Sequence, residues 1–268
     1  MHTTRSKALK AMAAATASML LLMTGCIRIV PGGDGIVGSR DLETKEYDFT
    51  DFTTVEVGSA FEVEIRQSDT YGVSITLNEN LFEYLDISRS GTTLRILMKT
   101  PQDYHQATRH ASITMPELRT LNLLGANRGK VFGFTTDQDM TFLVTGASDL
   151  ELADMQAGDT TFNVSGASRV TGSITIADGD FDVIAASTIE LEGSGIAVDL
   201  NVVAASSARL ERFPVKTATA NVIAASNATL EVSDRMDIDV SAASRLVYGG
   251  DAILGSIQVS GGSTLSRR

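Results

Sequence analysis

The second half of the chain repeats a short phrase of small residues that ends in a serine or an asparagine. The intervals between successive copies are 21, 20, 19, 19, 20, 18 and 19 residues. The eight end positions are Asn127, Ser148, Ser168, Ser187, Ser206, Ser226, Ser244 and Ser263. A repeat of about 20 residues is typical of a solenoid, in which each unit buries its apolar side against its neighbours.

Apolar residues occupy fixed positions before each Ser or Asn. The residue four positions before it is Val in seven copies and Leu in the first, and the residue six positions before it is always apolar. Positions two apart point to the same face of a strand, so both face the interior. The position two before is always Gly or Ala. Alternation predicts that it faces inward as well, and two consecutive small residues predict a sharp corner.

These patterns predict an all-β chain that forms a single-stranded parallel β-helix, right-handed like most such solenoids, with about 20 residues per coil. Regular coils are expected over 121–268, and less regular short strands over 43–120. A leucine-rich repeat would need a scaffold of Leu and Asn that the chain lacks. Period-2 alternation and frequent β-branched residues exclude helical repeats.

The repeated serines have a catalytic and a structural interpretation. A serine nucleophile needs a general base beside it, but His2, His105 and His110 are the only histidines, and all lie outside the repeats. A hydroxyl at a tight corner instead pairs with a backbone group. We therefore expect a structural ladder and no catalytic residue. Asp182 and Asp239 are three coils apart, too far to share a metal ion, so neither a metal site nor a cofactor is expected.

An apolar stripe is the first candidate for a contact surface. The position three before each corner Ser should face outward, and three consecutive coils place Ile184, Val203 and Ile223 there. An exposed apolar stripe can bind a partner or a second copy. The alternative is structural, because β-branched residues suit a flat sheet and another part of the chain can cover them.

A polar loop is the second candidate. The segment 101–111 is the longest polar interruption of the strands and carries Tyr104, His105, Arg109 and His110. Loops on a rigid scaffold are frequent recognition sites. A solvated loop without a ligand is the alternative interpretation.

The first residues have the pattern of a secretory signal, expected over 1–25. Residues 1–10 carry three basic side chains and no acid, and 11–23 form an apolar run. This run is too short for a bilayer, which needs about 20 residues. The sequence LMTGC at 22–26 resembles the bacterial lipobox, in which the cysteine is lipidated and becomes the N-terminus. Cys26 is thus the expected lipidation site, and an ordinary secreted thiol is the alternative.

The segment 26–42 is expected to be a flexible tether, since 27–40 contain four Gly and one Pro. Removal of 1–25 would change the formal charge from −11 to −14, because three basic residues and no acid are lost. This charge argues against a nucleic-acid partner. Ile27, rather than an aspartate, follows the cysteine, which favours the outer membrane of a bacterial cell envelope as the place of the exported protein.

The order of short motifs resembles a known family. The motifs are FTTVEVGSAFEVEIRQ at 52–67, NL at 80–81, LRI at 94–96, ITMPEL at 113–118 and LLGAN at 123–127. Over 47–250 the chain resembles the family called "putative auto-transporter adhesin, head GIN domain". The resemblance implies a secreted or lipid-anchored bacterial protein with a β-helical fold, and it supplies no catalytic residues.

The sequence therefore predicts a lipid-anchored, non-catalytic β-solenoid of the envelope that serves adhesion or protein–protein contact. Its expected partners are the membrane, through Cys26, and an envelope protein, a second copy or a glycan. A polysaccharide-binding or polysaccharide-cleaving protein is one alternative, although such enzymes need acids gathered on one face, and the acids here are expected to be scattered through turns. A purely structural envelope spacer is the other.

Overall fold

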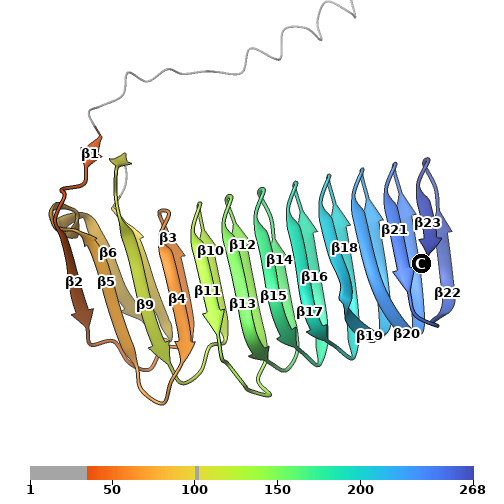
Figure 1. Cartoon of the computed structure of the whole chain (residues 1–268), viewed down its shortest axis with the longest axis horizontal. Helices are drawn as coiled ribbons and strands as arrows, with labels where there is room; N and C mark the ends of the chain where they lie inside the picture. The colour runs from red at the N-terminus through yellow and green to blue at the C-terminus, as the bar shows by residue number, and fades with distance from the viewer. Residues whose placement is uncertain (1–34, 100–102) are drawn as a thin grey trace, which may run out of the picture. The chain divides into compact units, whose positions relative to one another are not determined.

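The computed structural model describes residues 35–99 and 103–268. The signal 1–25, Cys26 and most of the tether therefore lie outside the described residues. The chain divides into Met1–Ile36 and Val37–Arg268, and the second part is a rod of stacked β-strands (Figure 1). Over the described ranges, no helix has the length and apolarity that crossing a membrane requires.

Each coil contributes one strand to each of two parallel walls, which we call wall A and wall B. Wall A contains β7 (Thr93–Met98), β3 (Thr54–Gly58), β10 (Thr120–Leu124), β12 (Met140–Thr145), β14 (Thr160–Val164), β16 (Asp178–Ile184), β18 (Ala197–Val203) and β22 (Ile253–Val259). Wall B contains β9 (Arg109–Met115), β4 (Glu62–Gln67), β11 (Arg128–Phe132), β13 (Asp149–Gln156), β15 (Arg169–Thr175), β17 (Thr188–Ser194), β21 (Arg245–Gly249) and β23 (Thr264–Arg267). The long strands β19 (Ser207–Ile223) and β20 (Asn227–Ser241) pass through both walls.

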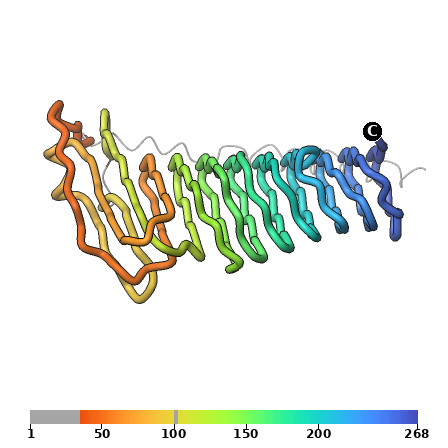
Figure 2. Tube along the Cα trace, turned by 60° about the horizontal axis from the view of Figure 1, so that its bottom comes forward, coloured from red at the N-terminus to blue at the C-terminus, as the bar shows by residue number. Residues whose placement is uncertain are grey.

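The expected parallel β-solenoid is thus confirmed, with repeats about 20 residues apart. Successive coils have nearly the same outline when the rod is seen from another side (Figure 2). The two walls face each other and enclose one continuous core, so the rod is flat in cross-section. The handedness of the helix stays a prediction.

Apolar side chains from both walls fill this core at the predicted positions. Three phenylalanines from successive coils pack on one another: the ring centroids of Phe142 and Phe162 are 4.9 Å apart, and those of Phe162 and Phe181 are 5.1 Å apart. All three are completely buried. Aromatic contacts of this kind stabilise a core beyond the area that they bury.

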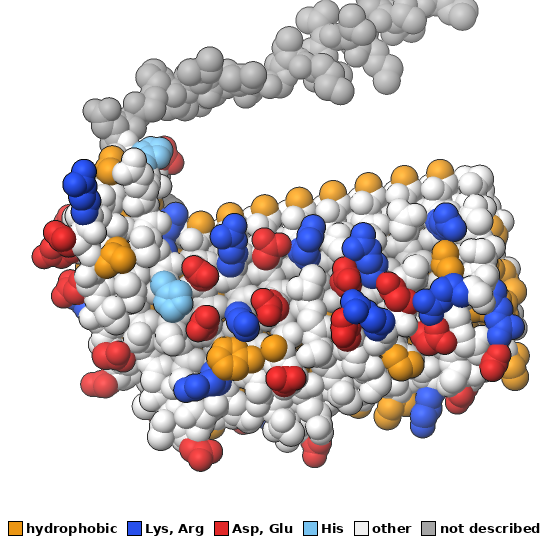
Figure 3. All heavy atoms as spheres, in the orientation of Figure 1, with side chains coloured by type: hydrophobic (Ala, Val, Ile, Leu, Met, Phe, Trp, Pro, Cys, Tyr) orange, Lys and Arg blue, Asp and Glu red, His pale blue; other side chains and the backbone are white. Residues whose placement is uncertain are grey.

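The corner between wall A and wall B is a two-residue turn with both residues in the left-handed conformation. Ala185 and Ala186 have φ of 56° and 63°, and Ala204 and Ala205 have φ of 59° and 62°. Positive φ at both central residues is the mark of a type I′ turn. The expectation that the first small residue points inward is wrong, because two left-handed residues break the alternation of an extended strand. Ala185 is exposed, and a row of apolar side chains runs along the upper edge of the rod (Figure 3).

The serines form the predicted structural ladder. The backbone N–H of each corner Ser donates to the Oγ of the Ser in the next coil: Ser187 to Ser206 and Ser206 to Ser226, both at 3.2 Å. Seven such bonds connect the corners from Asn127 to Ser263. Because these hydroxyls are buried and occupied by backbone groups, they are not available as nucleophiles.

The N-terminal end of the rod is built differently. The strand β2 (Leu42–Tyr47) pairs antiparallel with β5 (Gly72–Asn78), which pairs antiparallel with β9 on wall B. The 3-10 helix η1 (Glu79–Tyr84) then leads to β6 (Leu85–Ser90), which pairs antiparallel with β7 on wall A. Leu81 of η1 is completely buried. This segment therefore covers the first end of the core. The two-residue strands β1 (Ile36–Val37) and β8 (Tyr104–His105) complete the described elements.

The chain enters the rod at this end. In the segment assigned to the tether, the N–H of Ser39 donates to Asn80 Oδ1 at 2.8 Å, and its carbonyl accepts from Asn78 Nδ2 at 2.6 Å. Residues 39–41 are thus hydrogen-bonded to the beginning of η1 and belong to the folded rod.

Candidate functional site

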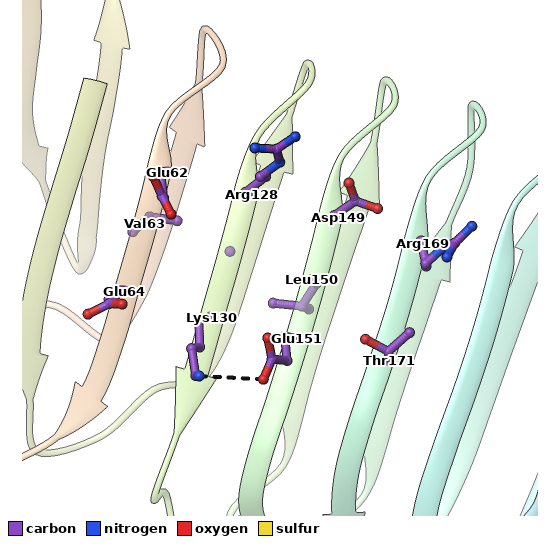
Figure 4. Close-up of a pocket in the computed structure, with 11 residues that line it drawn as sticks. Glu62, Val63, Glu64, Arg128, Lys130, Asp149, Leu150, Glu151, Arg169 and Thr171 are labelled. Carbon is purple, nitrogen blue, oxygen red and sulfur yellow. Dashed lines mark ion pairs between the residues drawn. The ribbon is translucent and has the colours of Figure 1, made fainter. Parts of the chain in front are cut away.

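Two rows of side chains cross the outer face of wall B. In the regular coils, the residue that follows the corner Ser or Asn lies in the first row, and the residue two positions later lies in the second. Glu62 and Glu64 of β4 continue the two rows by strand pairing. The first row holds Glu62, Arg128, Asp149 and Arg169, and the second holds Glu64, Lys130, Glu151 and Thr171 (Figure 4). Neighbouring strands are about 4.8 Å apart, so opposite charges alternate at that interval. Acidic and basic side chains are correspondingly interleaved on this face (Figure 3).

A groove of 530 Å³ runs between the two rows. We call it the charged groove. Its floor is the strand backbone around Val63, Gly129 and Leu150, and the charged side chains form its sides. Such an open, shallow shape suits an extended ligand or a protein surface better than an enclosed small molecule.

The four charges of the first row have no ionic partner among the described residues, whereas the second row contains one pair. The Nζ of Lys130 lies 3.4 Å from Glu151 Oε1 (dashed line in Figure 4), and both side chains are well exposed. Exposed pairs of this kind contribute about 0–1 kcal/mol. Over the described ranges Arg128, Asp149 and Arg169 form no salt bridge. Their donors and acceptors are thus available to a ligand.

The charged groove continues into the predicted recognition loop. A second cavity of 480 Å³ is lined by Arg109 and His110 and shares Glu62, Arg128 and Asp149 with the first. The strand β9 lies beside β4, which places His110 directly opposite Glu62. Two of the four predicted loop residues therefore border the groove.

The other two loop residues lie elsewhere. Tyr104 lines a neighbouring depression of 290 Å³ together with Arg109, and its hydroxyl donates to the carbonyl of Lys99 at 2.7 Å. Burial, and then the nearby Tyr84, raises the pKa of the Tyr104 phenol. His105 is exposed and lines none of these three cavities.

Arg109 connects the loop to the groove and is the most unusual charge of the site. Its Nε is buried and has no hydrogen-bond partner among the described residues. Burial lowers the pKa of its guanidinium, and Tyr104 acts in the opposite direction. A buried donor without a partner is costly.

The predicted apolar stripe lies on the opposite side of the rod. The outer face of wall A carries Ile184, Val203 and Ile223 as direct neighbours in register. Ile184 is 40% exposed, and Val203 and Ile223 are half-buried. The structure thus brings the three residues together, and their role as a contact surface stays a prediction.

A row of acidic and amide side chains lies next to the stripe on the outer face of wall A. Asn201 Nδ2 donates to Asp182 Oδ1 at 2.9 Å, and Asn221 Nδ2 donates to Asn201 Oδ1 at 3.0 Å, as expected for a structural amide ladder. Burial, with nearby Asp182 and Asp199, raises the pKa of the Asp180 carboxyl. In the part of the chain that the structure describes, no three His, Cys, Asp or Glu side chains are grouped to hold a metal ion.

The comparisons with known proteins agree with this architecture. The model of the family described as "putative auto-transporter adhesin, head GIN domain" matches residues 51–252. The chain belongs to this family. Membership implies a protein exported to the cell envelope or surface, and it supports an adhesion-like β-solenoid. A search of curated proteins found no match.

Solved structures with the same fold include three proteins from two Parabacteroides species. A putative adhesin from Parabacteroides distasonis is 17% identical, with a TM-score of 0.78 over 88% of this chain and 100% of that one. A putative adhesin from Parabacteroides merdae is 15% identical, with a TM-score of 0.74 over 88% and 100%. A putative lipid-binding protein from P. distasonis is 18% identical, with a TM-score of 0.70 over 87% and 99%. At these identities the likeness shows the fold alone.

Proposed function

We propose that this GIN-domain protein is a lipid-anchored, non-catalytic β-solenoid that makes adhesive contacts through the charged groove. The groove supports this proposal because its exposed charges are largely without partners and continue into the loop around Arg109. Ionic and hydrogen-bonding groups at fixed spacing on a rigid wall give specificity without reorganisation of the binder. The contact partner proposed here is a protein or glycan of the cell envelope or of another surface.

Removal of two groove cations should weaken adhesion. We expect Arg128→Ala with Arg169→Ala to reduce binding of the soluble full chain, carrying Cys26→Ser, to isolated cell envelopes at least tenfold, because each lost charged contact is worth about 1.5–3 kcal/mol. Binding is measured by a pull-down titration. Arg245→Ala is the matched control, since Arg245 occupies the same row on β21, outside the groove. Equal binding by the double variant and the control would exclude the groove as the adhesive surface.

The anchor requires a separate test. We expect the chain expressed in a bacterium to incorporate radiolabelled palmitate and to sediment with the membranes. Cys26→Ala should abolish the label and release the protein into the soluble fraction, because the acyl chains supply the membrane affinity. Undiminished label in the variant would contradict lipidation at Cys26, whatever the result of the adhesion experiment.

Polysaccharide binding or cleavage is the second candidate function. The acids were expected to be scattered through turns, but Glu62 and Asp149 lie on one face, on either side of Arg128. This arrangement supports a sugar site, in which carboxylates and guanidinium groups bind hydroxyls. Incubation with neutral and acidic polysaccharides separates the possibilities: retention without new reducing ends indicates binding, and release of reducing ends indicates cleavage.

A further inference from the structure

Among the described residues, no segment covers the last coil of the rod. The strands β22 and β23 pair only with β20 and β21, so their outer edges meet no strand of the described residues. Ile257 and Val259 occupy the core positions of this coil yet are 47% and 43% exposed. In the preceding coil the corresponding Ile238 and Val240 are buried. We call the outer edges of β22 and β23, with the apolar side chains between them, the tail face.

The two ends of the rod differ in the residues that face outward. The end strands at the N-terminal side, β2 and β6, have the sequences LETKEY and LDISRS and carry charged residues. Such charges keep edge strands from pairing. The end strand β22 has the sequence ILGSIQV and no charge, whereas β23 has the sequence TLSR and one charge, Arg267, which pairs with Asp251. A long, uncharged edge strand is a site where another strand adds.

A partner for the tail face must satisfy two edges at once. The walls are about 10 Å apart, as packed sheets are, and the apolar ends of the core lie between them. A single extended peptide would pair with only one edge. The tail face of a second copy, turned by a two-fold axis, presents two matching edges and a matching apolar centre. The two-fold operation reverses the strands, so each new pair would be antiparallel, as β6 and β7 are at the other end.

We propose that two copies of this chain associate tail to tail through β22 and β23. Head-to-tail stacking would instead place the uncharged β22 edge against the charged β6 edge, and β23 against the charged β2 edge. Such a contact desolvates charges without partners. The isologous contact is closed, so association stops at two copies and does not continue to a filament.

The size of the tail face sets the expected affinity. A seven-residue strand is about 23 Å long, and two walls with their side chains are about 20 Å thick. The contact therefore buries about 900 Å² over both copies, below the size of a stable interface and in the range of transient ones. We expect a dissociation constant in the micromolar range.

This inference rests on the proposed adhesive function and names a partner for it. Residues 39–41 enter the rod at its N-terminal end, beside η1, and the tail face is at the other end (Figure 1). A tail-to-tail pair therefore holds its two entry points at opposite extremes, about 100 Å apart for two rods of twelve stacked strands each. Copies anchored on two facing membranes would be joined by such a contact.

Sedimentation of the full chain with Cys26→Ser tests the contact. We expect monomer at about 1 μM and mostly dimer at several hundred μM. Ile257→Lys with Val259→Lys should weaken dimerisation at least tenfold, because the lysines of two copies repel each other at the two-fold axis. Ile196→Lys, a substitution of a similarly exposed isoleucine three coils away and outside the apolar stripe, should leave it unchanged. A wild-type chain that stays monomeric at all concentrations overturns the inference, as does equal association of both variants.

A second measurement covers the case in which the double lysine variant disrupts the last coil. In the Cys26→Ser background, Gln258→Cys introduces a single thiol on β22, and Asn227→Cys introduces one on wall B. A short bismaleimide should cross-link the Gln258→Cys protein into dimers at least tenfold faster than the Asn227→Cys protein. Equal rates overturn the tail-to-tail arrangement.

Lipid-coated beads that carry the protein at its N-terminus separate the two proposals. Bead clustering that the Ile257→Lys, Val259→Lys variant loses supports both. Dimers in solution without clustering support the contact but not its adhesive role. Binding of monomeric protein to envelopes through the charged groove, without dimers at any concentration, supports the proposed function and overturns the tail-to-tail contact.

Discussion

Replacing Phe162 with alanine is expected to lower the free energy of unfolding by about 3–5 kcal/mol. The ring is completely buried, stacks on Phe142 with an interplanar angle of 13° and meets the edge of Phe181. The cavity cannot close easily, because hydrogen bonds fix the spacing of the coils on both walls. Urea unfolding followed by far-UV circular dichroism measures the loss.

A partly exposed residue of the same region provides the control. Ile184→Ala removes apolar atoms from the adjoining strand β16, but its side chain is 40% exposed, so we expect a loss of about 1 kcal/mol or less. Equal losses for the two variants would mean that the phenylalanine column does not hold the coils together.

Gly172→Ala is expected to lower the free energy of unfolding by more than about 4 kcal/mol, an exceptional value for one methyl group. Gly172 has φ of +125° and lies where β15 passes a register shift in β13, between Leu152 and Met155. A Cβ atom would overlap the backbone carbonyl of Leu152. Since that carbonyl belongs to the wall itself, neither side can move without breaking strand pairing.

Gly133→Ala separates backbone strain from this overlap. Gly133 has φ of +77°, and a Cβ there would meet no atom within 4 Å. The substitution should therefore cost only the left-handed strain of about 1–2 kcal/mol. Thermal and urea unfolding of both variants should differ by at least 2 kcal/mol, and equal costs would show that the close approach of Leu152 is not the cause.

The regular coils could be predicted because the same physical environment recurs at each repeat. Residues such as Val183 and Val202 occupy one position of the coil, so its burial is visible as a column of apolar residues. The serine ladder could be predicted for the same reason, because a corner that recurs needs the same backbone partner in every coil.

The conformation of the corner could not be predicted from alternation. Alanine rarely adopts a left-handed backbone conformation. From the sequence, Ala185 and Ala186 therefore indicate a position that requires a small side chain, not one that requires positive φ. The indication was the glycine at the same position of other copies, as in Gly146 and Gly166, whose φ is also positive. A repeat position that is Gly in some copies and Ala in others is compatible with a left-handed turn. It is equally compatible with a position in the core that has no room for a larger side chain.

The charged groove was missed, although half of its signal is in the sequence. Arg128, Asp149 and Arg169 follow three consecutive corners. A comparison of this position across the repeats would have shown that the charges alternate in sign. The rest could not be read, because Glu62 and His110 come from the N-terminal part, which has no repeat to fix its register. Glu62 lies beside Arg128 because β4 pairs with β11, and His110 lies on the other side of Glu62 because β9 pairs with β4. These pairings join strands that are far apart in the sequence.

The unequal edges of the rod have a consequence for how such a chain can change in length over evolution. Every corner from 125 onward is a turn of two residues, whereas the opposite edge absorbs the variation in repeat length from 18 to 21 residues. Duplication or loss of one whole repeat would keep all ladders in register and would change the rod by about 4.8 Å. A single inserted residue within a strand would instead turn core side chains outward. The rods of relatives of this protein should therefore differ in length in discrete steps of one coil.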